Sequence, residues 1–360
     1  METYIIYNFI LFGTMLFAYC FQIAKYNLSK KILFFISLSI PLFFLILRYD
    51  IGTDYQNYIE YFYKIKSGEE VSKEIGYVFI NRLVDYFELH TQWIFIIFGI
   101  GFIVFSYLAL PKEHLALSLF FFITTMYLYE GFSTIRQGLA VAIMAYALKY
   151  VHKKEFLKYG LLGLFAISFH TITGLLLLIL YPFLTVNLRS WVYISIICIL
   201  FVLMQYTAIG TLLFHYTGQI IPKYEWYLTS KFSTEAQTSF GLIGPLIKVS
   251  IALFIFFFKN KIVTEDKRLN VFFNLYFFYV ISYIFHLKIS IFGRVEHIFI
   301  FSQIMIMTYF IYYFKGYAKL IVMSGLCLFF YLMFIRYIAN GTLDVDNDVY
   351  INPYQMIIFR

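Results

Sequence analysis

The chain of 360 residues is 62% hydrophobic and 13% charged, whereas a soluble globular domain carries roughly 25% charged residues. This composition excludes an ordinary soluble protein and indicates an integral membrane protein. Its 28 Lys and Arg exceed its 20 Asp and Glu. In a membrane protein such an excess reflects basic cytoplasmic loops, so we expect no nucleic acid as a partner. Its three cysteines, Cys20, Cys198 and Cys327, lie far apart in apolar runs and predict neither a disulfide framework nor a thiolate metal site.

Apolar segments recur along the whole chain, and about 20 residues of helix span a hydrocarbon core of roughly 30 Å. They predict an all-α, polytopic bundle of about 11 to 12 transmembrane segments, a single membrane domain over residues 1–360 in contact with membrane lipids. The first segment has no Lys or Arg before Lys25, so we expect a retained span rather than a cleaved signal peptide. The segments lie near 4–24, 32–47, 91–110, 115–129, 137–151, 159–182, 191–210, 241–258, 269–287, 297–315 and 320–338.

Charge assigns the connections to the two sides of the membrane. Segment 48–90 contains five Lys or Arg against eight Asp or Glu, which predicts an outer location, and 211–240 is predicted as a second outer loop. Short basic connections indicate the cytoplasm: Lys25, Lys30 and Lys31; Lys153, Lys154 and Lys158; Lys259, Lys261, Lys267 and Arg268; Lys315 and Lys319.

A count of crossings gives a conflict at one point. Residues 152–158 and 259–268 are both predicted to be cytoplasmic, yet only three apolar runs lie between them. A break at His170, which with Thr171 and Thr173 interrupts the run 159–182, would give two shorter helices that meet at an outer tip. Non-helical backbone at membrane depth requires burial in protein or a water-filled cavity, so this break predicts that His170 lines a cavity. A crossing within 211–240 is the alternative, which four charged residues there disfavour.

With this topology both termini face outward, and polar residues near helix ends gather on the outer side. The residues in this group are Arg48, Asp50, Asp54, Glu74, Arg136, Gln137, His170, Arg294, Glu296 and His297. This concentration is the main indication of function in the sequence.

The stretch RYDIGTDYQNYIEYFYKI (48–65) interleaves carboxylates with tyrosines. Asp50 and Asp54 are four residues apart and share a face if the stretch is helical. Carboxylates can orient sugar hydroxyls and aromatic rings can cover pyranose faces, so the composition suits an extended glycan. An aromatic belt at the membrane interface is the alternative for the tyrosines.

The stretch EIGYVFINRLVDYFELH (74–90) has apolar residues at 75, 79, 83 and 86/87 with polar residues between them. It is too polar to span a membrane and predicts an amphipathic helix at the outer interface. A structural role is favoured for most of it, while Glu74 at its start is predicted to point into a cavity.

Arg136 in FSTIRQGLAVA (132–142) precedes an apolar run, and Arg294 in IFGRVEH (291–297) repeats the arrangement. The planar guanidinium suits an anionic group such as phosphate, and two arginines that converge on one outer cavity would suit a diphosphate. Snorkelling of the side chain to lipid headgroups is the alternative.

His170 at the break is a candidate proton acceptor near neutral pH, against the alternative of a hydrogen-bonded buried histidine. No HxxxH or HxxE spacing occurs, so no metal site is predicted.

Four of these motifs together resemble the EpsG-like family of Wzy-type bacterial polysaccharide polymerases. They are RYDIGTDY (48–55), EIGY (74–77), IRQGLA (135–140) before a basic turn, and SFH (168–170). The resemblance is strongest over 48–182, and beyond it Arg294 is the only residue that aligns. It implies polymerisation of O-antigen, capsule or exopolysaccharide repeat units carried on undecaprenyl pyrophosphate, on the outer side of the bacterial plasma membrane, and a chain-length regulator as a protein partner.

These observations predict a metal-independent glycosyltransferase without a cofactor. Arg136 and Arg294 are predicted to stabilise the pyrophosphate leaving group, with Arg48 as a third cation. His170 is predicted to take the acceptor proton, with Asp54 as the second candidate. The predicted substrate-binding residues are Arg48, Asp50, Tyr55, Glu74, Tyr77, Gln137, Glu296 and His297. A flippase or other transporter of lipid-linked oligosaccharide, or a ligase of the O-antigen type, is the alternative.

Overall fold

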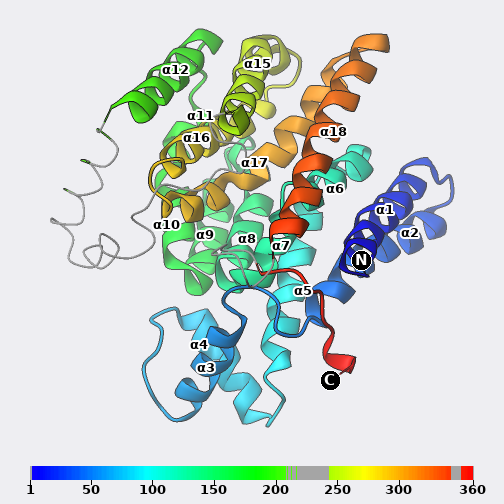
Figure 1. Ribbon diagram of the computed structural model, residues 1–360, viewed down its shortest axis with the longest axis vertical. Coiled ribbons are helices and arrows are strands. Elements are labelled where there is room, and N and C mark those ends of the chain that lie inside the picture. Colours follow the sequence, from blue (N-terminus) through cyan, green and yellow to red (C-terminus); the bar gives the residue numbers. More distant parts are fainter. Residues whose placement is uncertain are drawn as a thin grey trace. The chain divides into compact units, whose positions relative to one another are not determined.

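The computed structural model describes residues 2–207, 243–341 and 350–359, with positions 209, 212 and 216 (Figure 1). The predicted second outer loop at 211–240 therefore lies almost entirely outside the described residues. The described part of the chain is helical, and its only β feature is a bridge between Arg48 and Met356. The prediction of an all-α membrane protein is confirmed.

The chain divides into two compact units, residues 1–181 with 307–360, and residues 182–306. The helices of the first unit are α1 (Glu2–Ile23), α2 (Asn27–Ile46), α3 (Tyr55–Lys66), α4 (Ile75–Tyr86), α5 (Gln92–Ala109), η1 (Lys112–His114), α6 (Leu115–Thr124), α7 (Tyr127–Ser133), α8 (Ile135–Val151), α9 (Phe156–Phe169), α10 (Thr171–Ile179), α18 (Gly316–Asn340) and η3 (Ile357–Phe359). The second unit contains α12 (Ser190–Tyr206), α15 (Ile243–Glu265) and α16 (Leu269–His286), while α11 (Tyr181–Thr185) and α17 (Phe292–Tyr313) each contribute to both. The prediction of one polytopic domain stays a prediction.

Each predicted apolar segment is largely helical in its described residues, but fewer described helices than predicted are long enough to span a membrane by themselves. Six described helices are long and apolar enough to cross a membrane, or seven if the bent pair Lys112–Thr124 and Tyr127–Ser133 forms one span. The prediction of 11 to 12 counted each apolar run as a transmembrane segment, with the run 159–182 divided in two at His170. Several runs instead form helices of 17 residues or fewer, as in α9, α10 and α12.

The first unit has two ends that differ in chemistry. Helix α1 runs from one end to the other. Near its start, the Tyr7 hydroxyl donates to the carbonyl of Ile351 at 2.6 Å; near its end, Gln22 donates to the carbonyl of Glu113. The second end holds the basic connections 25–31 and 315–319 of this unit, with Lys319 3.9 Å above the Tyr312 ring and that ring stacked on His114. A helix of 22 residues is about 33 Å long, so these ends, named the motif end and the basic end, lie a membrane thickness apart.

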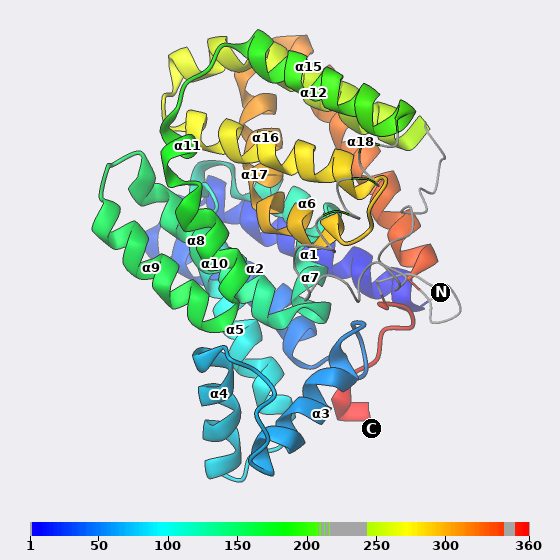
Figure 2. The same cartoon turned by 90° about the vertical axis from the view of Figure 1, so that its left-hand side faces the viewer.

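The break predicted at His170 is confirmed. α9 ends at Phe169, α10 begins at Thr171, and His170 between them is extended, with φ −151° and ψ 102°. The two helices fold back side by side (Figure 2), and the Tyr159 hydroxyl of α9 donates to the Leu177 carbonyl of α10 at 2.6 Å. A Cβ on Gly174 would lie 2.7 Å from the backbone nitrogen of Ile167, so the absence of a side chain allows this close packing.

This hairpin makes a topology prediction. A single cysteine at position 170, in a background without Cys20, Cys198 and Cys327, is expected to react with a membrane-impermeant maleimide in intact cells, because the break lies at the end of the hairpin opposite the basic 152–158 turn. Positions 153 and 189 are expected to react only after permeabilisation. An unreactive position 170 together with a reactive position 189 would contradict the split-helix topology.

α3 and α4 are two short helices beside the N-terminal part of α5. The ring of Tyr55 stacks on Phe95 with 4.5 Å between centroids, and the ring of Tyr77 lies 5.9 Å from that of Phe98. The amphipathic helix predicted at 74–90 is confirmed as α4. Its apolar stripe is exposed, as a helix at a lipid interface requires: Ile75, Phe79, Leu83, Tyr86 and Phe87.

Candidate functional site

The four motifs come together at the motif end of the first unit, and the first of them is organised by Arg48. This side chain is fully buried and donates to three backbone carbonyls, those of Leu45 at 2.6 Å, Phe132 at 3.1 Å and Ile51 at 3.3 Å. Burial lowers the pKa of Arg48 to about 10, so the side chain remains charged at neutral pH. These contacts join the 48–55 loop to the α7–α8 junction.

Gly52 brings the same loop against the same junction. Its φ is +96°, and a Cβ there would lie 2.1 Å from the carbonyl oxygen of Phe132. The next residue, Thr53, donates its backbone N–H to the Ser133 hydroxyl at 3.2 Å. The C-terminal segment closes the loop from the other side, since Gly52 N–H donates to the Tyr350 carbonyl at 2.7 Å.

Gly52→Ala is expected to destabilise the protein strongly, because it adds the cost of a left-handed backbone, about 1–3 kcal/mol, to a clash with backbone. Gly68→Ala is the matched control: its φ is +90°, but nothing lies within 4 Å of a Cβ there. The measurement is the yield and thermal stability of detergent-purified protein. Equal losses in the two variants would show that the close approach at Phe132 contributes nothing.

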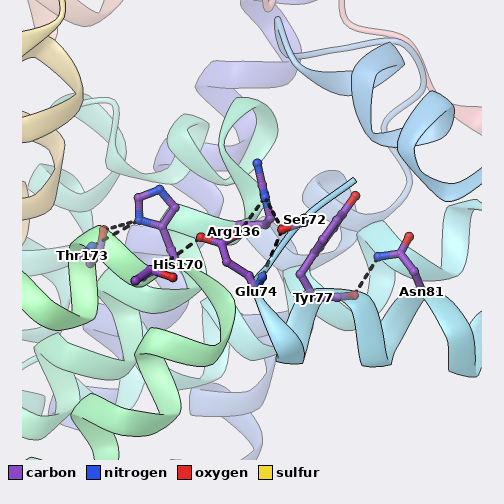
Figure 3. Close-up of polar contacts among 8 residues, drawn as sticks. Ser72, Glu74, Tyr77, Asn81, Arg136, His170 and Thr173 are labelled. Atoms are coloured by element: carbon purple, nitrogen blue, oxygen red, sulfur yellow. Dashed lines mark hydrogen bonds and ion pairs between the residues drawn. The ribbon is translucent and has the colours of Figure 1, made fainter. Parts of the chain in front are cut away.

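Glu74 connects the other three motifs (Figure 3). Its Oε2 pairs with Nη1 of Arg136 at 2.7 Å, and its Oε1 accepts the backbone N–H of Thr171 at 3.0 Å. The Ser72 hydroxyl lies 3.3 Å from the same Nη1. One carboxylate therefore joins the segment before α4, the start of α8 and the start of α10.

Gly76 strengthens this junction. A Cβ on Gly76 would lie 2.7 Å from the Ser168 hydroxyl and 3.0 Å from the Phe169 ring. The EIGY and SFH motifs thus owe their close packing to a residue without a side chain.

Arg136 lies in a partly buried aromatic setting. Its guanidinium carbon is 4.9 Å from the ring centroid of Tyr77 and 5.8 Å from that of Tyr58, and its buried Nε has no hydrogen-bond partner in the described part of the chain. Burial raises the pKa of Tyr58 to about 12, although the charge of Arg136 acts against this rise. Arg136 is therefore a cation that is paired with one carboxylate and still has N–H groups to donate. Such a side chain is suited to binding an anion.

The contacts of His170 determine which ring nitrogen carries the proton. Its Nδ1 accepts the backbone N–H of Thr173 at 3.3 Å, as the cap of α10, and lies 2.8 Å from the Thr173 hydroxyl. A nitrogen that accepts a backbone N–H is unprotonated, so the neutral ring carries its proton on Nε2. In this tautomer the ring can donate a hydrogen bond at Nε2 but cannot take up a proton there. The geometry favours a role for His170 as a hydrogen-bond donor over its predicted role as the general base.

The remaining predicted residues of the first unit lie at or near this junction. Asp50, with φ +52°, accepts from Gln56 at 2.6 Å, and Asp54 accepts from Asn57 at 3.2 Å directly before α3. The Tyr55 hydroxyl donates to Gln92 at 3.1 Å, and Gln137 is buried on α8. Both aspartates are half-buried at the ends of the loop, while Tyr55 is part of its support.

Arg294, Glu296 and His297 belong to the second unit. Arg294 is exposed, His297 is half-buried, and the buried Glu296 lies 2.8 Å from Nδ1 of His286. Because Arg136 is in the other unit, the predicted convergence of Arg136 and Arg294 on one cavity stays a prediction.

The sequence analysis did not identify three residues that contact the predicted site residues. Gln92 donates to the carbonyls of Ile46 and Arg48, Ser72 contacts Arg136, and His286 contacts Glu296. His286 lies at the end of the apolar run 269–287, which the sequence analysis treats as a membrane span. Its position ten residues before Glu296, across a short turn between two helices, is the pattern that could have indicated the pair.

Comparison with known proteins gives one result. Residues 31–356 match the model of the EpsG family, which spans all four motifs and both units. Searches of curated proteins and of solved structures found no match. Since the match covers nearly the whole chain, this multi-pass membrane protein belongs to the EpsG family.

Proposed function

We propose that this protein is a Wzy-type polysaccharide polymerase on the outer face of a bacterial plasma membrane. It would join undecaprenyl-pyrophosphate-linked oligosaccharide repeat units into O-antigen, capsule or exopolysaccharide. The observation that carries the proposal is that three of the four motifs meet at the Arg136–Glu74 pair, with tyrosine rings beside it, and that the fourth, RYDIGTDY, lies against the neighbouring α7–α8 junction. Membership in the EpsG family supports a role in polysaccharide biosynthesis.

The charge of the two ends supports an outward-facing site. Lys25, Lys112 and Lys319 lie at or next to the basic end, and excess Lys and Arg mark cytoplasmic connections. The motif end lies a membrane thickness away and contains the acidic 48–90 segment. A site there faces the side on which completed repeat units are exposed.

The proposed reaction transfers the growing chain to a new repeat unit. A hydroxyl oxygen of the acceptor attacks the anomeric carbon of the reducing-end sugar of the donor chain. The bond from that carbon to the phosphate oxygen breaks, and undecaprenyl pyrophosphate leaves with the bonding electrons. The hydroxyl proton passes to a base on the protein, and negative charge grows on the leaving phosphate.

Arg136 is placed to bind that charge. Its guanidinium can contact two phosphate oxygens at once, and the rings of Tyr58 and Tyr77 hold it in place. The Nε2–H of His170 would donate a second hydrogen bond to the leaving group. Arg48 already donates hydrogen bonds to three backbone carbonyls. It would stabilise the loop that presents Asp50 and Asp54 to sugar hydroxyls.

Reconstitution tests the proposal. Purified protein in liposomes, supplied with lipid-linked repeat units isolated from its own host, is expected to form a ladder of polymers on undecaprenyl pyrophosphate, with and without a chelator. A deletion strain is expected to retain single repeat units attached to their final acceptor. Absence of any attached glycan in that strain would indicate a ligase or a flippase instead, and loss of activity with chelator would contradict a metal-independent reaction.

A further inference from the structure

One terminal nitrogen of Arg136 has both of its hydrogens engaged within the first unit. Nη1 donates to Oε2 of Glu74 at 2.7 Å and to the Ser72 hydroxyl at 3.3 Å, and each terminal nitrogen of a guanidinium carries two hydrogens. Nε carries one, and it is buried in the protein. A paired contact with phosphate needs parallel N–H groups on two neighbouring nitrogens. Neither edge of the guanidinium is therefore open to phosphate while Glu74 and Ser72 hold Nη1.

The Glu74 carboxylate occupies a position that suits the oxygens of a phosphate (Figure 3). One of its oxygens accepts from Arg136, and the other accepts the backbone N–H of Thr171 at 3.0 Å. Thr171 is the first residue of the nine-residue helix α10, and N–H groups at the start of a helix favour anions. Two oxygens of one phosphate group are spaced much as those of a carboxylate, so they fit the same two donors.

Glu74 can leave this position while the helices around it stay packed. Gly76 fits α4 against Ser168, where a Cβ would lie 2.7 Å from the hydroxyl, and the N–H of Val78 donates to the Glu74 carbonyl at 3.0 Å. These contacts hold the backbone, so rotation of the Glu74 side chain is enough for release. The side chains of Arg136 and Glu74 are 25% and 13% exposed, so a ligand can reach the pair from the surface.

We propose that the position of the Glu74 carboxylate is the phosphate subsite, and that a phosphate of undecaprenyl pyrophosphate displaces Glu74 from Arg136 and Thr171. The proposal rests on the proposed polymerase function and names the donors that hold the leaving group. Carboxylate and phosphate exclude each other there, because two anions on one cation repel. When the product leaves, Glu74 returns to Arg136. The cation thus has an anionic partner throughout the cycle, and the returning carboxylate favours product release.

The test measures binding of undecaprenyl pyrophosphate to purified protein in detergent, with inorganic pyrophosphate as competitor. Glu74→Gln is expected to bind both ligands about fivefold more tightly or better, because the neutral amide is a weaker competitor for Arg136 than the carboxylate. Glu69→Gln is the matched control. It removes the same charge from the same connection between α3 and α4, where Glu69 is exposed and accepts from Ser67, and its affinities are expected to equal those of the wild type.

A second variant tests the donor from α10. Thr171→Pro removes only that backbone N–H, since proline is favoured at the first position of a helix and the preceding His170 is already extended, as a residue before proline should be. Added to Glu74→Gln, it is expected to weaken binding of both ligands about tenfold, the contribution of a hydrogen bond to a charged group, with thermal stability recorded for each protein.

Two results would overturn the phosphate subsite while the polymerase function stands. The first is a Glu74→Gln protein that binds pyrophosphate no more tightly than the wild type, or more weakly, because Glu74 would then only hold Arg136 in place. The second is an unchanged affinity on addition of Thr171→Pro. A wild-type protein that forms no polymer from host repeat units would instead refute the proposed function, and this proposal with it.

Discussion

Arg136→Lys is expected to reduce polymer formation per folded enzyme by about 10²–10³, which corresponds to about 2.7–4 kcal/mol of transition-state stabilisation. The lysine keeps the positive charge and can still pair with Glu74, 62 positions away in the sequence. A point ammonium, however, cannot make the paired contact with two phosphate oxygens or stack on Tyr77 as the guanidinium does. The loss should therefore appear in activity rather than in the amount of folded protein.

The alanine variant is less informative by itself. Arg136→Ala leaves the carboxylate of Glu74, which is only 13% exposed, without its cation, and removal of one partner of a buried pair costs about 3–5 kcal/mol. Reduced yield is therefore expected for Arg136→Ala. Glu74→Gln is a milder change, because its amide oxygen can still accept from Thr171 and the half-buried Arg136 cation loses only the charge of its partner.

The matched control for Arg136→Lys is Arg268→Lys. Arg268 also pairs with a carboxylate, that of Asp266 at 2.6 Å, but the arginine side chain is 61% exposed on a short connection. Exposed pairs contribute about 0–1 kcal/mol, so this variant is expected to behave as the wild type. Normal polymer from both Arg136→Lys and Glu74→Gln would show that the Arg136–Glu74 pair only joins helices.

His170→Asn is expected to fold normally and to be about a hundredfold less active. The asparagine oxygen can accept the backbone N–H of Thr173 and so retain the cap of α10. It lacks any group in the place of Nε2–H, and loss of one preorganised donor to a developing anion costs about 10²–10³ in rate. The measurement is again polymer per folded enzyme, with thermal stability recorded for each variant.

His170→Ala separates the two contributions of this residue. It removes the cap, which is worth about 1 kcal/mol, as well as the donor, so both stability and activity are expected to fall. If His170→Asn retained full activity, capping alone would account for the histidine, and the donor to the leaving group would have to be sought among Tyr58 and Tyr77.

The sequence determined the membrane class, the helical segments and the break at His170 because these depend on neighbouring residues. An apolar run long enough to cross a bilayer must satisfy its backbone within itself, so hydropathy alone locates the helices. The polar His170, Thr171 and Thr173 interrupt such a run, and their local hydrogen bonds cap the new helix. The apolar stripe of α4 follows in the same way from helical periodicity.

Only the tertiary structure decided what each charged residue of the site contacts. The sequence did not show that Arg48 is fully buried among backbone carbonyls or that Glu74 bridges Arg136 to Thr171. These pairings join residues 62 to 97 positions apart, and they depend on close packing at Gly52 and Gly76. The tautomer of His170 was also undetermined by sequence, because the protonated nitrogen of a neutral imidazole is set by the partner that folding brings to it.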